Sequence, residues 1–403
     1  MVNISAIVLP LLSILGAIVG AYILFLALLT IPPIQRHIIY LHRIKLPFLK
    51  DLNIPEQWRF LRGQVTPFNL ETSDGETLHT WHILPLDVYR QHHDDLRAEP
   101  TGLRVKIDDT FSFKSLREDP EARLVLYFHG AAGTMAMVHR PESYHTIFSL
   151  SPRTHILAFD YRGFGRSTGM PSEAGLLHDA LALVEFAMTD LVVPPERIVL
   201  FGQSLGTAVV VKLSCELAIR KKPVLFKGMV LMSPFTDIAS LTKTFRLGGV
   251  VPLLSPIASF PWLVTFFNGF LVDKWDSGGQ LAKFVGKCGG IEMEGREEKF
   301  NVMIIHAEDD PRIPWTQSKE LLRRAVFGRR TDDESVNENE FEAELKKRKV
   351  ELVAGGWDVE WKGISGVIKA HILKFGLHGP FMRHPVLSLA IAKAFEGTFE
   401  KDI

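Results

Sequence analysis

The sequence predicts an α/β protein with a mostly parallel sheet that is covered by helices on both faces, preceded by one membrane-spanning helix. Two observations support this fold class. Short apolar, β-branched runs alternate with helical patterns from about residue 64 to the end of the chain, and residues 1–35 carry no charged side chain. The length of 403 residues allows two or three domains at about 100–200 residues each, although α/β folds often form one larger domain.

The composition excludes several other classes of protein. The chain has 46 Lys and Arg residues against 46 Asp and Glu residues, so no basic excess is present to neutralise phosphates and nucleic-acid binding is not expected. Its 2 cysteines are too few for a disulfide framework. With 46% hydrophobic and 10% aromatic residues, the chain is a folded protein and not a disordered one.

The N-terminus has the length and composition of a membrane anchor. The apolar stretch from residue 4 to residue 31 has 28 residues. As a helix it would be about 42 Å long, against a hydrocarbon thickness of about 30 Å. It is too long for a signal peptide, and neither a basic segment nor a small-x-small cleavage site accompanies it. We therefore expect residues 1–35 to form an uncleaved single-pass anchor with a span at about 4–31. The alternative is a buried core helix.

The surroundings of this span bear on its orientation and pairing. All nearby basic residues follow it, and this bias favours a cytosolic catalytic part, although one short tail carries little topological information. Gly16 and Gly20 form a G-x-x-x-G pattern that can pair membrane helices. Glycine is also generally tolerated in such helices. The pattern therefore has two interpretations: a homodimer through the anchor, or glycines without a role in pairing.

The remainder is expected to consist of a linker, residues 36–63, and one α/β domain, residues 64–403. Runs typical of buried parallel strands occur at residues 124–128, 155–159, 198–201, 229–231 and 302–305, each bounded by Gly, Pro, Ser or Asp. Helical patterns lie between them, at residues 172–188, 205–220 and 315–327. Strands that alternate with helices in this way predict right-handed strand–helix–strand units and a parallel sheet.

The chain contains two G-x-S-x-G matches, at residues 165–169 and 202–206. A nucleophile elbow requires a strand, a sharp turn and then a helix, so that the serine hydroxyl lies at the N-terminus of the helix. Ser204 follows the predicted strand and precedes an amphipathic run to residue 220, whereas Ser167 is followed by a loop with Met170 and Pro171. We therefore predict that Ser204 is a nucleophile and that Ser167 is a loop serine.

A serine nucleophile needs a base, and the base needs an orienting carboxylate, in the chain order Ser, Asp or Glu, His for this architecture. The strand at residues 301–305 is followed by Glu308, Asp309 and Asp310. They would lie at the carboxyl end of a strand, where sites collect in open α/β sheets. The pattern alone does not choose among the three.

The base should come from a loop after the last strand, which we predict at residues 367–375. His378 lies between two glycines in such a loop, before the final helix that starts near Pro385. It fits this role better than His371, which lies within the strand pattern, or His384, which abuts the start of the helix.

A pocket for the oxyanion is the third requirement. Residues 126–133 read as a strand that ends in a His129-Gly130 turn. The backbone of this turn can direct the N–H of Ala131 toward the point that the N–H of Leu205 also faces, Leu205 being the residue after the nucleophile.

Three segments interrupt the regular alternation. Residues 87–120 are polar and turn-rich, and we expect a surface insertion there. A second segment is a cap at about residues 236–284, in which residues 247–272 carry no charge. A full membrane span there would place the two halves of the candidate site on opposite sides of the bilayer, and its prolines and glycines would break a helix repeatedly. We expect an apolar cap over the sheet edge that reaches the membrane interface. The third segment, at about residues 329–362, is densely charged, and we expect it to be a solvent-exposed insertion.

From about residue 64 to its end, the chain resembles the α/β-hydrolase superfamily. More narrowly, it is similar to abhydrolase-12-type, membrane-anchored monoacylglycerol and lysophosphatidylserine lipases, in a fungal-like variant. The resemblance rests on the motifs at residues 126–133, 160–169, 202–206 and 310–314, and on His378 seven residues before Pro385.

The resemblance implies a serine hydrolase of lipid acyl esters, located in the endoplasmic reticulum membrane, that needs no metal or cofactor. In such families the acid is the aspartate three residues before an apolar-Pro pair, here Ile313-Pro314, and this selects Asp310. Three alternatives stay open: a protein thioester deacylase, an acyltransferase, and an inactive membrane-anchored interaction protein. The His-x₄-Asp pattern sometimes linked to acyl transfer occurs at His82 and at His155, in both cases on or beside predicted strands.

Overall fold

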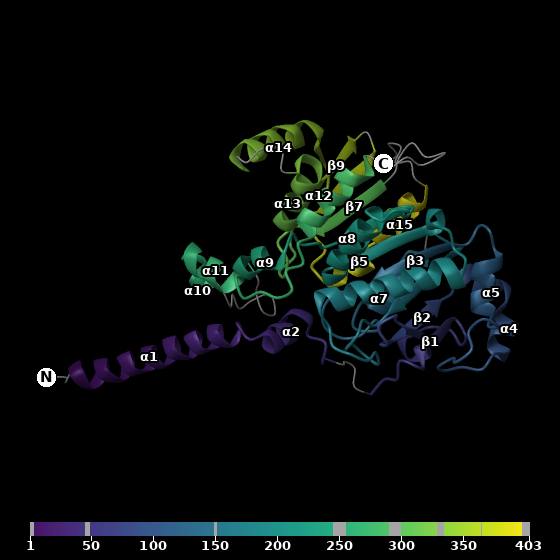
Figure 1. The fold of residues 1–403 in the computed structure, drawn as a ribbon, viewed down its shortest axis with the longest axis horizontal. Helices are drawn as coiled ribbons and strands as arrows, with labels where there is room; N and C mark the ends of the chain where they lie inside the picture. Colours follow the sequence, from purple (N-terminus) through teal and green to yellow (C-terminus); the bar gives the residue numbers. More distant parts are fainter. Residues whose placement is uncertain are drawn as a thin grey trace.

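The computed structural model describes residues 4–44, 49–148, 151–244, 255–289, 300–328, 334–363 and 365–396. These residues form one ten-stranded sheet in the order β1-β2-β4-β3-β5-β6-β7-β10-β9-β8, with helices on both faces (Figure 1). The predicted α/β fold with a mostly parallel sheet is thereby confirmed.

The centre of the sheet is parallel and buried. Its six strands pair in parallel from β4 to β10: β3 (Arg123–Phe128), β4 (Thr154–Phe159), β5 (Ile198–Gln203), β6 (Gly228–Met232), β7 (Phe300–Ala307) and β10 (Gly366–Leu373). They include all the strands expected from the apolar runs. Because the carboxyl ends of parallel strands share one edge, the loops that follow β3, β5, β7 and β10 meet there.

Four antiparallel strands extend this centre. On one side β1 (Val65–Glu71) and β2 (Thr77–Ile83) form a hairpin next to β4, and on the other β9 (Gly356–Gly363) and β8 (Val350–Glu351) follow β10. At the outer edge, the carbonyl of Pro67 accepts a hydrogen bond from the amide of Arg104. At the opposite edge β8 is only two residues long and exposed.

Successive side chains of the central strands point alternately toward two layers of helices, one on each face of the sheet. Leu124, Leu126 and Phe128 face the layer of α7 (Glu173–Glu185), α8 (Leu205–Ala218), α12 (Ser277–Cys288) and α13 (Thr316–Phe327). Val125 and Tyr127 face α6 (Arg140–Phe148) and α15 (Val386–Glu396). This alternation is what the period of two along a strand dictates. The core therefore lies on both faces of the sheet and holds the strand ends rigid.

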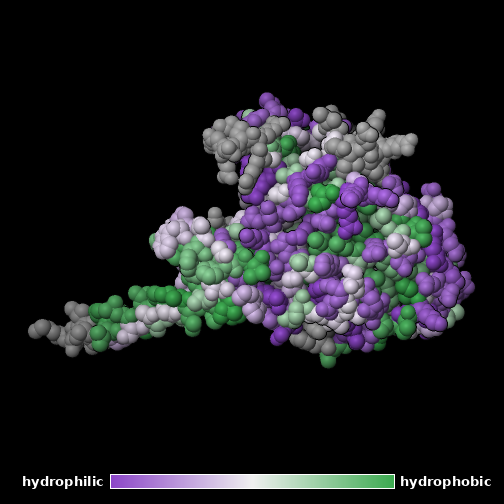
Figure 2. All heavy atoms as spheres, in the orientation of Figure 1, coloured by the Kyte–Doolittle hydropathy of each residue, from purple (hydrophilic) through white to green (hydrophobic). Residues whose placement is uncertain are grey.

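The N-terminal helix α1 (Ile4–Leu28) projects away from this body (Figures 1 and 2). Its 21 residues Val8–Leu28 have a mean hydropathy of 2.5 and are almost entirely exposed, and α1 is the one helix among the described residues long and apolar enough to cross a membrane. Helix α2 (Pro32–Tyr40) begins directly after it, with Pro32 and Pro33 in its first turn, where a missing backbone N–H costs nothing. The helix thus ends three residues earlier than the apolar stretch suggests.

The described parts of the segment expected to be a linker, residues 36–44 and 49–63, pack against the body instead of spanning a gap. Tyr40 is fully buried, and Trp58 (in the 3₁₀ turn Pro55–Trp58) and Phe60 join the core beside Trp81. The indole of Trp81 also donates to the carbonyl of Leu52. Large aromatic side chains would be costly to leave in water, and they fix the chain between α1 and β1 to the domain.

The insertions fold into helices. Between β2 and β3 lie α3 (Leu86–Gln91), α4 (His93–Ala98) and α5 (Phe111–Glu118), and the charged insertion forms α14 (Glu334–Arg348) before β8 and β9. The expected cap contains α9 (Ile238–Thr244), α10 (Ser255–Ala258) and α11 (Pro261–Asn268). Its later part, α12, belongs to the layer over the sheet. Parts of the cap and of the charged insertion, residues 245–254 and 329–333, lie outside the described residues.

Candidate active site

Ser204 occupies a sharp turn between β5 and α8. Its backbone has φ 53° and ψ −118°, a conformation that a residue with a side chain adopts only when its surroundings force it. The two neighbouring glycines leave no room for a side chain: a Cβ on Gly202 would lie 2.5 Å from the carbonyl oxygen of Gly206, and one on Gly206 would lie 1.9 Å from that of Phe128. The hydroxyl is presented at the helix N-terminus, half-buried, between buried residues.

Asp310 and His378 lie together beside the carboxyl edge of the sheet, at the ends of β7 and β10. Oδ2 of Asp310 is 2.7 Å from Nδ1 of His378, and both side chains are buried. Because a carboxylate only accepts, Nδ1 of His378 carries a proton and donates to Oδ2, so in the neutral imidazole Nε2 is the nitrogen with the lone pair. This is the tautomer that a general base requires.

Three hydrogen bonds hold the Asp310 carboxylate. Oδ1 accepts from the amides of Arg312 and Ile313 at 2.8 and 3.0 Å, and Oδ2 accepts from His378. Nε2 of His306 lies 3.3 Å from Oδ2 and 2.9 Å from the carbonyl oxygen of Ile313. Burial acts to raise the pKa of Asp310, but hydrogen bonds from His306 and His378 outweigh it, so this pKa lies well below its ordinary value. The carboxylate is therefore ionised and fixed in orientation.

The two carboxylates before Asp310 have different partners. Oδ1 of Asp309 accepts from the amides of Gly376 and Leu377, both at 2.8 Å, and so holds the loop that carries His378. Glu308 pairs with Lys374 at 2.7 Å near the surface. Of the three carboxylates that the pattern left open, the structure brings Asp310 to the histidine.

Ser204 and His378 are not hydrogen-bonded in the described structure. The side-chain amide of Gln203, the residue before the serine, lies 3.5 Å from Nε2 of His378. The imidazole thus faces the elbow through Nε2. Hydrogen bonds of this kind are often long in enzymes without substrate, so the geometry is compatible with transfer of the serine proton to His378.

The His129-Gly130 turn packs directly against the elbow. A Cβ placed on Gly130 would lie 3.1 Å from Cβ of Ser204 and 2.4 Å from Oε1 of Gln203, so only glycine fits. The carbonyl of His129 accepts from the hydroxyl of Tyr161 at 2.9 Å.

Arg140 fixes the orientation of the next peptide groups. Its buried guanidinium donates to the carbonyls of Gly130 and Ala131 at 2.9 and 3.0 Å, and to the carbonyl of Thr134. The C=O and N–H of a trans peptide point in opposite directions, so anchoring the Gly130 carbonyl on Arg140 turns the Ala131 N–H away from the guanidinium. Burial lowers the pKa of Arg140 from its ordinary value.

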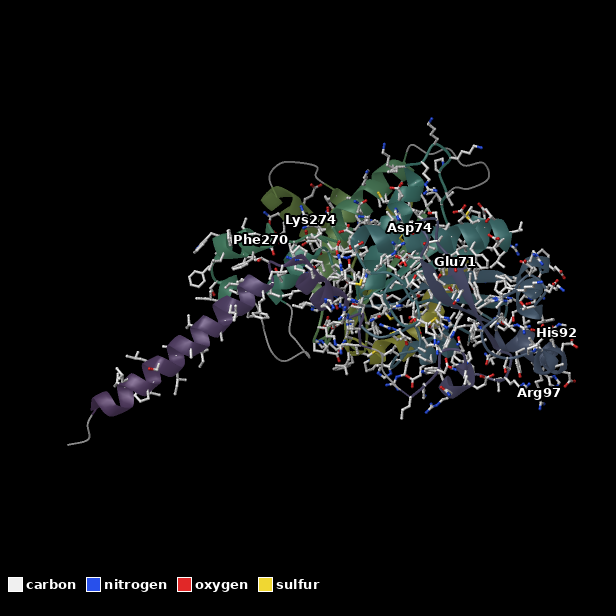
Figure 3. All side chains as sticks on the ribbon, turned by 60° about the horizontal axis from the view of Figure 1, so that its bottom comes forward. Glu71, Asp74, His92, Arg97, Phe270 and Lys274 are labelled. Carbon is white, nitrogen blue, oxygen red and sulfur yellow. The ribbon has the colours of Figure 1, made fainter. Side chains whose placement is uncertain are left out.

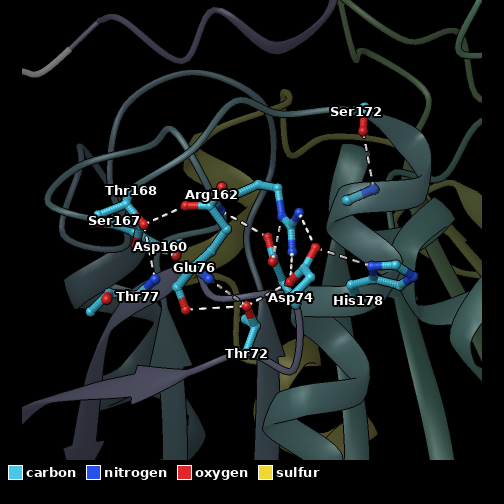
Figure 4. A network of polar contacts seen from close by, with 12 residues as sticks. Thr72, Asp74, Glu76, Thr77, Asp160, Arg162, Ser167, Thr168, Ser172 and His178 are labelled. Carbon is cyan, nitrogen blue, oxygen red and sulfur yellow. Dashed lines mark hydrogen bonds and ion pairs between the residues drawn. The ribbon is translucent and has the colours of Figure 1, made fainter.

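Ser167 has a structural environment. Its hydroxyl donates to the carbonyl of Asp160 at 2.6 Å and accepts from the amide of His79 (Figure 4). In the same network Arg162 pairs with both Asp74 and Asp179, and burial raises the pKa of Asp179 to about 6. Contacts of Ser167 with the β2 backbone tie the second glycine-rich loop to the sheet.

The remaining histidines considered above lie in other surroundings. His371 points from β10 to Asp358 on β9, and His384 accepts from the amide of Val386 at the start of α15. His82 and His155 lie on adjacent strands, fully buried, with their ring nitrogens 3.0 Å apart. Neither of the two His-x₄-Asp patterns presents its histidine to solvent or to a substrate.

Three roles in this site were not identified from the sequence. They are the contacts of Arg140 and His306, and the contact of Asp309 with the loop that carries His378. His306 immediately follows the predicted strand and lies four residues before Asp310, a proximity that could have been noticed. Arg140 belongs to no motif, so only the fold brings it to the turn.

A sheet of this strand order, with a strained serine between β5 and α8 and a buried Asp–His pair beyond β7, defines an ester hydrolase of the α/β type. The chain belongs to the alpha/beta hydrolase family: the sequence model of this family matches residues 125–336, just over half of the chain. The matched segment contains Ser204 and Asp310 and ends before His378.

Curated relatives resemble the chain over most of its length. It is 29% identical over 337 residues to lysophosphatidylserine lipase ABHD12 of Mus musculus, covering 83% of this chain and 75% of the relative. It is also 29% identical over 295 residues to protein ABHD12B of Homo sapiens, with coverages of 73% and 70%. These matches confirm the abhydrolase-12-type resemblance.

Among solved structures, an alpha-beta hydrolase from Vibrio vulnificus superposes with a TM-score of 0.52. The two sequences are 13% identical, and the match covers 89% of this chain and 92% of the other. At this identity the likeness shows the fold alone.

Proposed function

We propose that this protein is a membrane-anchored serine hydrolase that cleaves acyl esters of monoacylglycerols or lysophospholipids with a triad of Ser204, Asp310 and His378. The observation that carries this proposal is the strained Ser204 elbow beside an Asp310–His378 pair whose imidazole faces the elbow through Nε2, next to the side chain of Gln203. The similarity to lysophosphatidylserine lipase ABHD12 supports a lysophospholipid as the first substrate to test.

In the proposed mechanism, Oγ of Ser204 attacks the ester carbonyl carbon while His378 Nε2 takes the hydroxyl proton. Asp310 keeps the imidazole in the required tautomer and stabilises its positive charge. The amides of Ala131 and Leu205 stabilise the oxyanion, each donor contributing about 10²–10³-fold to the rate. His378 then protonates the departing alcohol. Water, deprotonated by the same imidazole, releases the fatty acid from Ser204.

The proposed location follows from α1. Its length and hydropathy support a single-pass anchor, and the family resemblance supports the endoplasmic reticulum membrane. Gly16 and Gly20 have no protein atom near their missing side chains, so the face that they share on α1 is open to a second anchor helix. A homodimer through this face is part of the proposal.

Covalent labelling with a fluorophosphonate probe tests the assignment of the nucleophile. We expect strong labelling of detergent-solubilised wild type and of Ser167→Ala, and little or none of Ser204→Ala and His378→Ala. Failure of correctly folded wild type to label would favour the inactive-scaffold alternative. Labelling that survives in Ser204→Ala would exclude Ser204 as the nucleophile.

A substrate panel then separates the chemical alternatives. Lysophosphatidylserine, a monoacylglycerol and an S-acylated peptide of equal acyl length present the same acyl group on different leaving groups. We expect release of fatty acid from one or both lipids and slower release from the peptide. Faster cleavage of the thioester would favour the protein deacylase.

A further inference from the structure

The cap helices α10 and α11 pack against the last turns of α1. Leu26 of α1 is buried with Ile257 and Val264 of the cap, and Tyr22, Phe25 and Leu29 surround this cluster together with Leu263 and Phe267. Figures 1 and 3 show the cap lobe beside the end of α1 that joins the body. The cap therefore lies level with the C-terminal part of the predicted span.

The part of the lobe that does not contact α1 exposes large apolar side chains. Trp262 is 68% exposed and Phe266 is 56% exposed. Phe260, Phe270 and Val272 are exposed as well, and residues 247–272 contain no charge. In Figure 2 the hydrophobic surface of α1 continues onto the adjoining lobe. Contiguous exposed aromatic groups of this kind mark an interaction surface, and Trp and Phe suit a membrane interface.

Two chain segments pass from apolar to charged sequence at the same level. After α1 the first charged residue is Arg36, and after the uncharged stretch of the cap, residues 247–272, it is Asp273. The buried side chain of Gln35 joins the two segments: its Nε2 donates to the carbonyls of Leu29 and Phe270, and its Oε1 accepts from the amide of Val272. In Figure 3, Phe270 lies in the lobe and Lys274 nearer the body. Both segments thus change from apolar to charged sequence at the same level of the molecule.

We propose that the cap lobe is a second membrane contact, which inserts from the side into the leaflet where α1 ends. The proposal rests on the proposed role of α1 as a membrane span. Tyr22 of α1 and Leu29, the residue that directly follows α1, both belong to the shared cluster and are about 10 Å apart at the rise of a helix. The lobe therefore enters to about this depth, as interfacial helices do, and does not cross the bilayer.

The junction between α1 and the cap has a hydrocarbon character. It contains a partly open cavity of about 50 Å³ lined by Leu26, Leu29, Ile257, Val264, Phe267 and Leu271 and by the polar residues Thr242 and Asn268. Water finds few hydrogen-bond partners in a mainly apolar cavity, so lipid acyl chains are more favourable than water beside this junction. The bilayer that holds α1 is continuous with this junction, which favours lipid over a partner protein as the occupant of the exposed face.

Depth-dependent fluorescence quenching tests this placement on the full chain. A fluorophore is attached to Trp262→Cys, to Ile18→Cys in the middle of α1, and to Val105→Cys, whose exposed position lies between α4 and α5 on the far side of the body. The native Cys215 and Cys288 are buried and protected from the label. Each protein is placed in phosphatidylcholine vesicles that carry nitroxide lipids of defined depth.

We expect deep nitroxides to quench the label at position 18, shallow ones to quench the label at position 262, and neither to quench the label at position 105. Quenching at 18 with none at 262 would overturn the cap contact and leave the anchor in place. The absence of quenching at both positions would overturn the anchor as well. Deep quenching at 262 would overturn the interfacial depth.

A kinetic measurement addresses the consequence of this contact. The double variant Trp262→Glu with Phe266→Glu should raise KM for a lipid substrate in vesicles about tenfold, because two charges replace apolar area at the interface. Its hydrolysis of a water-soluble short-chain ester should equal that of wild type, and Val105→Glu should affect neither. Equal KM values for double variant and wild type would contradict the proposal.

Discussion

The backbone amide of Ala132 donates a 2.9 Å hydrogen bond to the carbonyl of Tyr40, the last residue of α2. The same tyrosine donates through its hydroxyl to Asp273 at 2.8 Å and accepts from the indole of Trp275. One residue thus joins the helix that follows α1, the loop before α12, and the turn beside Ser204. The part of the molecule next to α1 and the candidate site share a buried hydrogen-bond network.

Tyr40→Phe should therefore destabilise the protein. The change removes one donor from the Asp273 carboxylate and leaves the Trp275 indole N–H without an acceptor, at a cost of about 1–3 kcal/mol in the free energy of unfolding. Thermal unfolding of the purified protein measures this. Tyr89→Phe, which removes a single hydroxyl bond to the Arg62 carbonyl, is the matched control and should cost less. Equal costs would argue against the network.

Arg140→Gln should lower kcat about 10²-fold for a soluble ester while leaving KM nearly unchanged. Without the guanidinium, the Gly130–Ala131 peptide can rotate, and its N–H loses the direction that oxyanion stabilisation requires. The exposed Arg153→Gln, which removes only a surface contact with Asp119, should leave both constants unaltered. If Arg140→Gln lowered only the stability of the fold and kept the kcat of the folded fraction, this positioning role would be excluded.

The neighbours Asp309 and Glu308 offer a matched comparison. Asp309→Ala removes the acceptor for the amides of Gly376 and Leu377, so the His378 loop shifts and kcat should fall about 10²-fold. Glu308→Ala removes an exposed ion pair with Lys374 and should change activity little. Steady-state kinetics of the two variants decides this, and similar activities would show that the loop is held by other contacts.

The buried His82–His155 pair predicts a pH-dependent stability. Burial lowers the pKa of His155 to about 3 and places that of His82 well below 6.5. The unfolded chain binds protons below about pH 6.5 and the folded chain does not. The stability contribution is therefore complete above pH 6.5 and declines as the pH falls toward 3.

Chemical denaturation between pH 7 and pH 4 measures this decline. The double variant His82→Phe with His155→Leu should show a flatter dependence of unfolding free energy on pH than wild type, since each removed group contributes up to about 1.4 kcal/mol per pH unit. The exposed His93→Asn should retain the wild-type slope. A double variant with the wild-type slope would place the proton uptake elsewhere.

The sequence predicted the parallel centre and the elbow because both are local patterns. Buried strands read as continuous apolar runs, and the Ser204 motif lies between a run of this kind and a helical pattern. The apolar runs that predict the sheet do not include strands β1 and β2: His79 and His82 interrupt the apolar pattern of β2, and only tertiary contacts bury them. Residues 36–63 were read as a linker since their aromatic side chains show no regular period.

At the candidate site, the order of elements led to Ser204 and His378, while Asp310 was chosen on resemblance. A sequence does not show which of three adjacent carboxylates points to a distant loop. In the structure that choice depends on the turn after β7, where the amides of Arg312 and Ile313 bind one oxygen of Asp310 and leave the other for His378. The role of Arg140 is even harder to predict from the sequence, because its guanidinium reaches the turn only when α6 is packed against the sheet.

The two edges of the sheet have a consequence for molecules crowded on one membrane. Exposed strand edges invite pairing between neighbouring copies and so lead to aggregation. Here one edge strand contains Pro67, which lacks an N–H and whose carbonyl is taken by Arg104, and the other is the two-residue β8 beside the Lys349–Glu351 ion pair. In the proposed membrane-anchored state, copies tethered by α1 would diffuse in two dimensions and collide side by side, and these blunt edges would let them separate again.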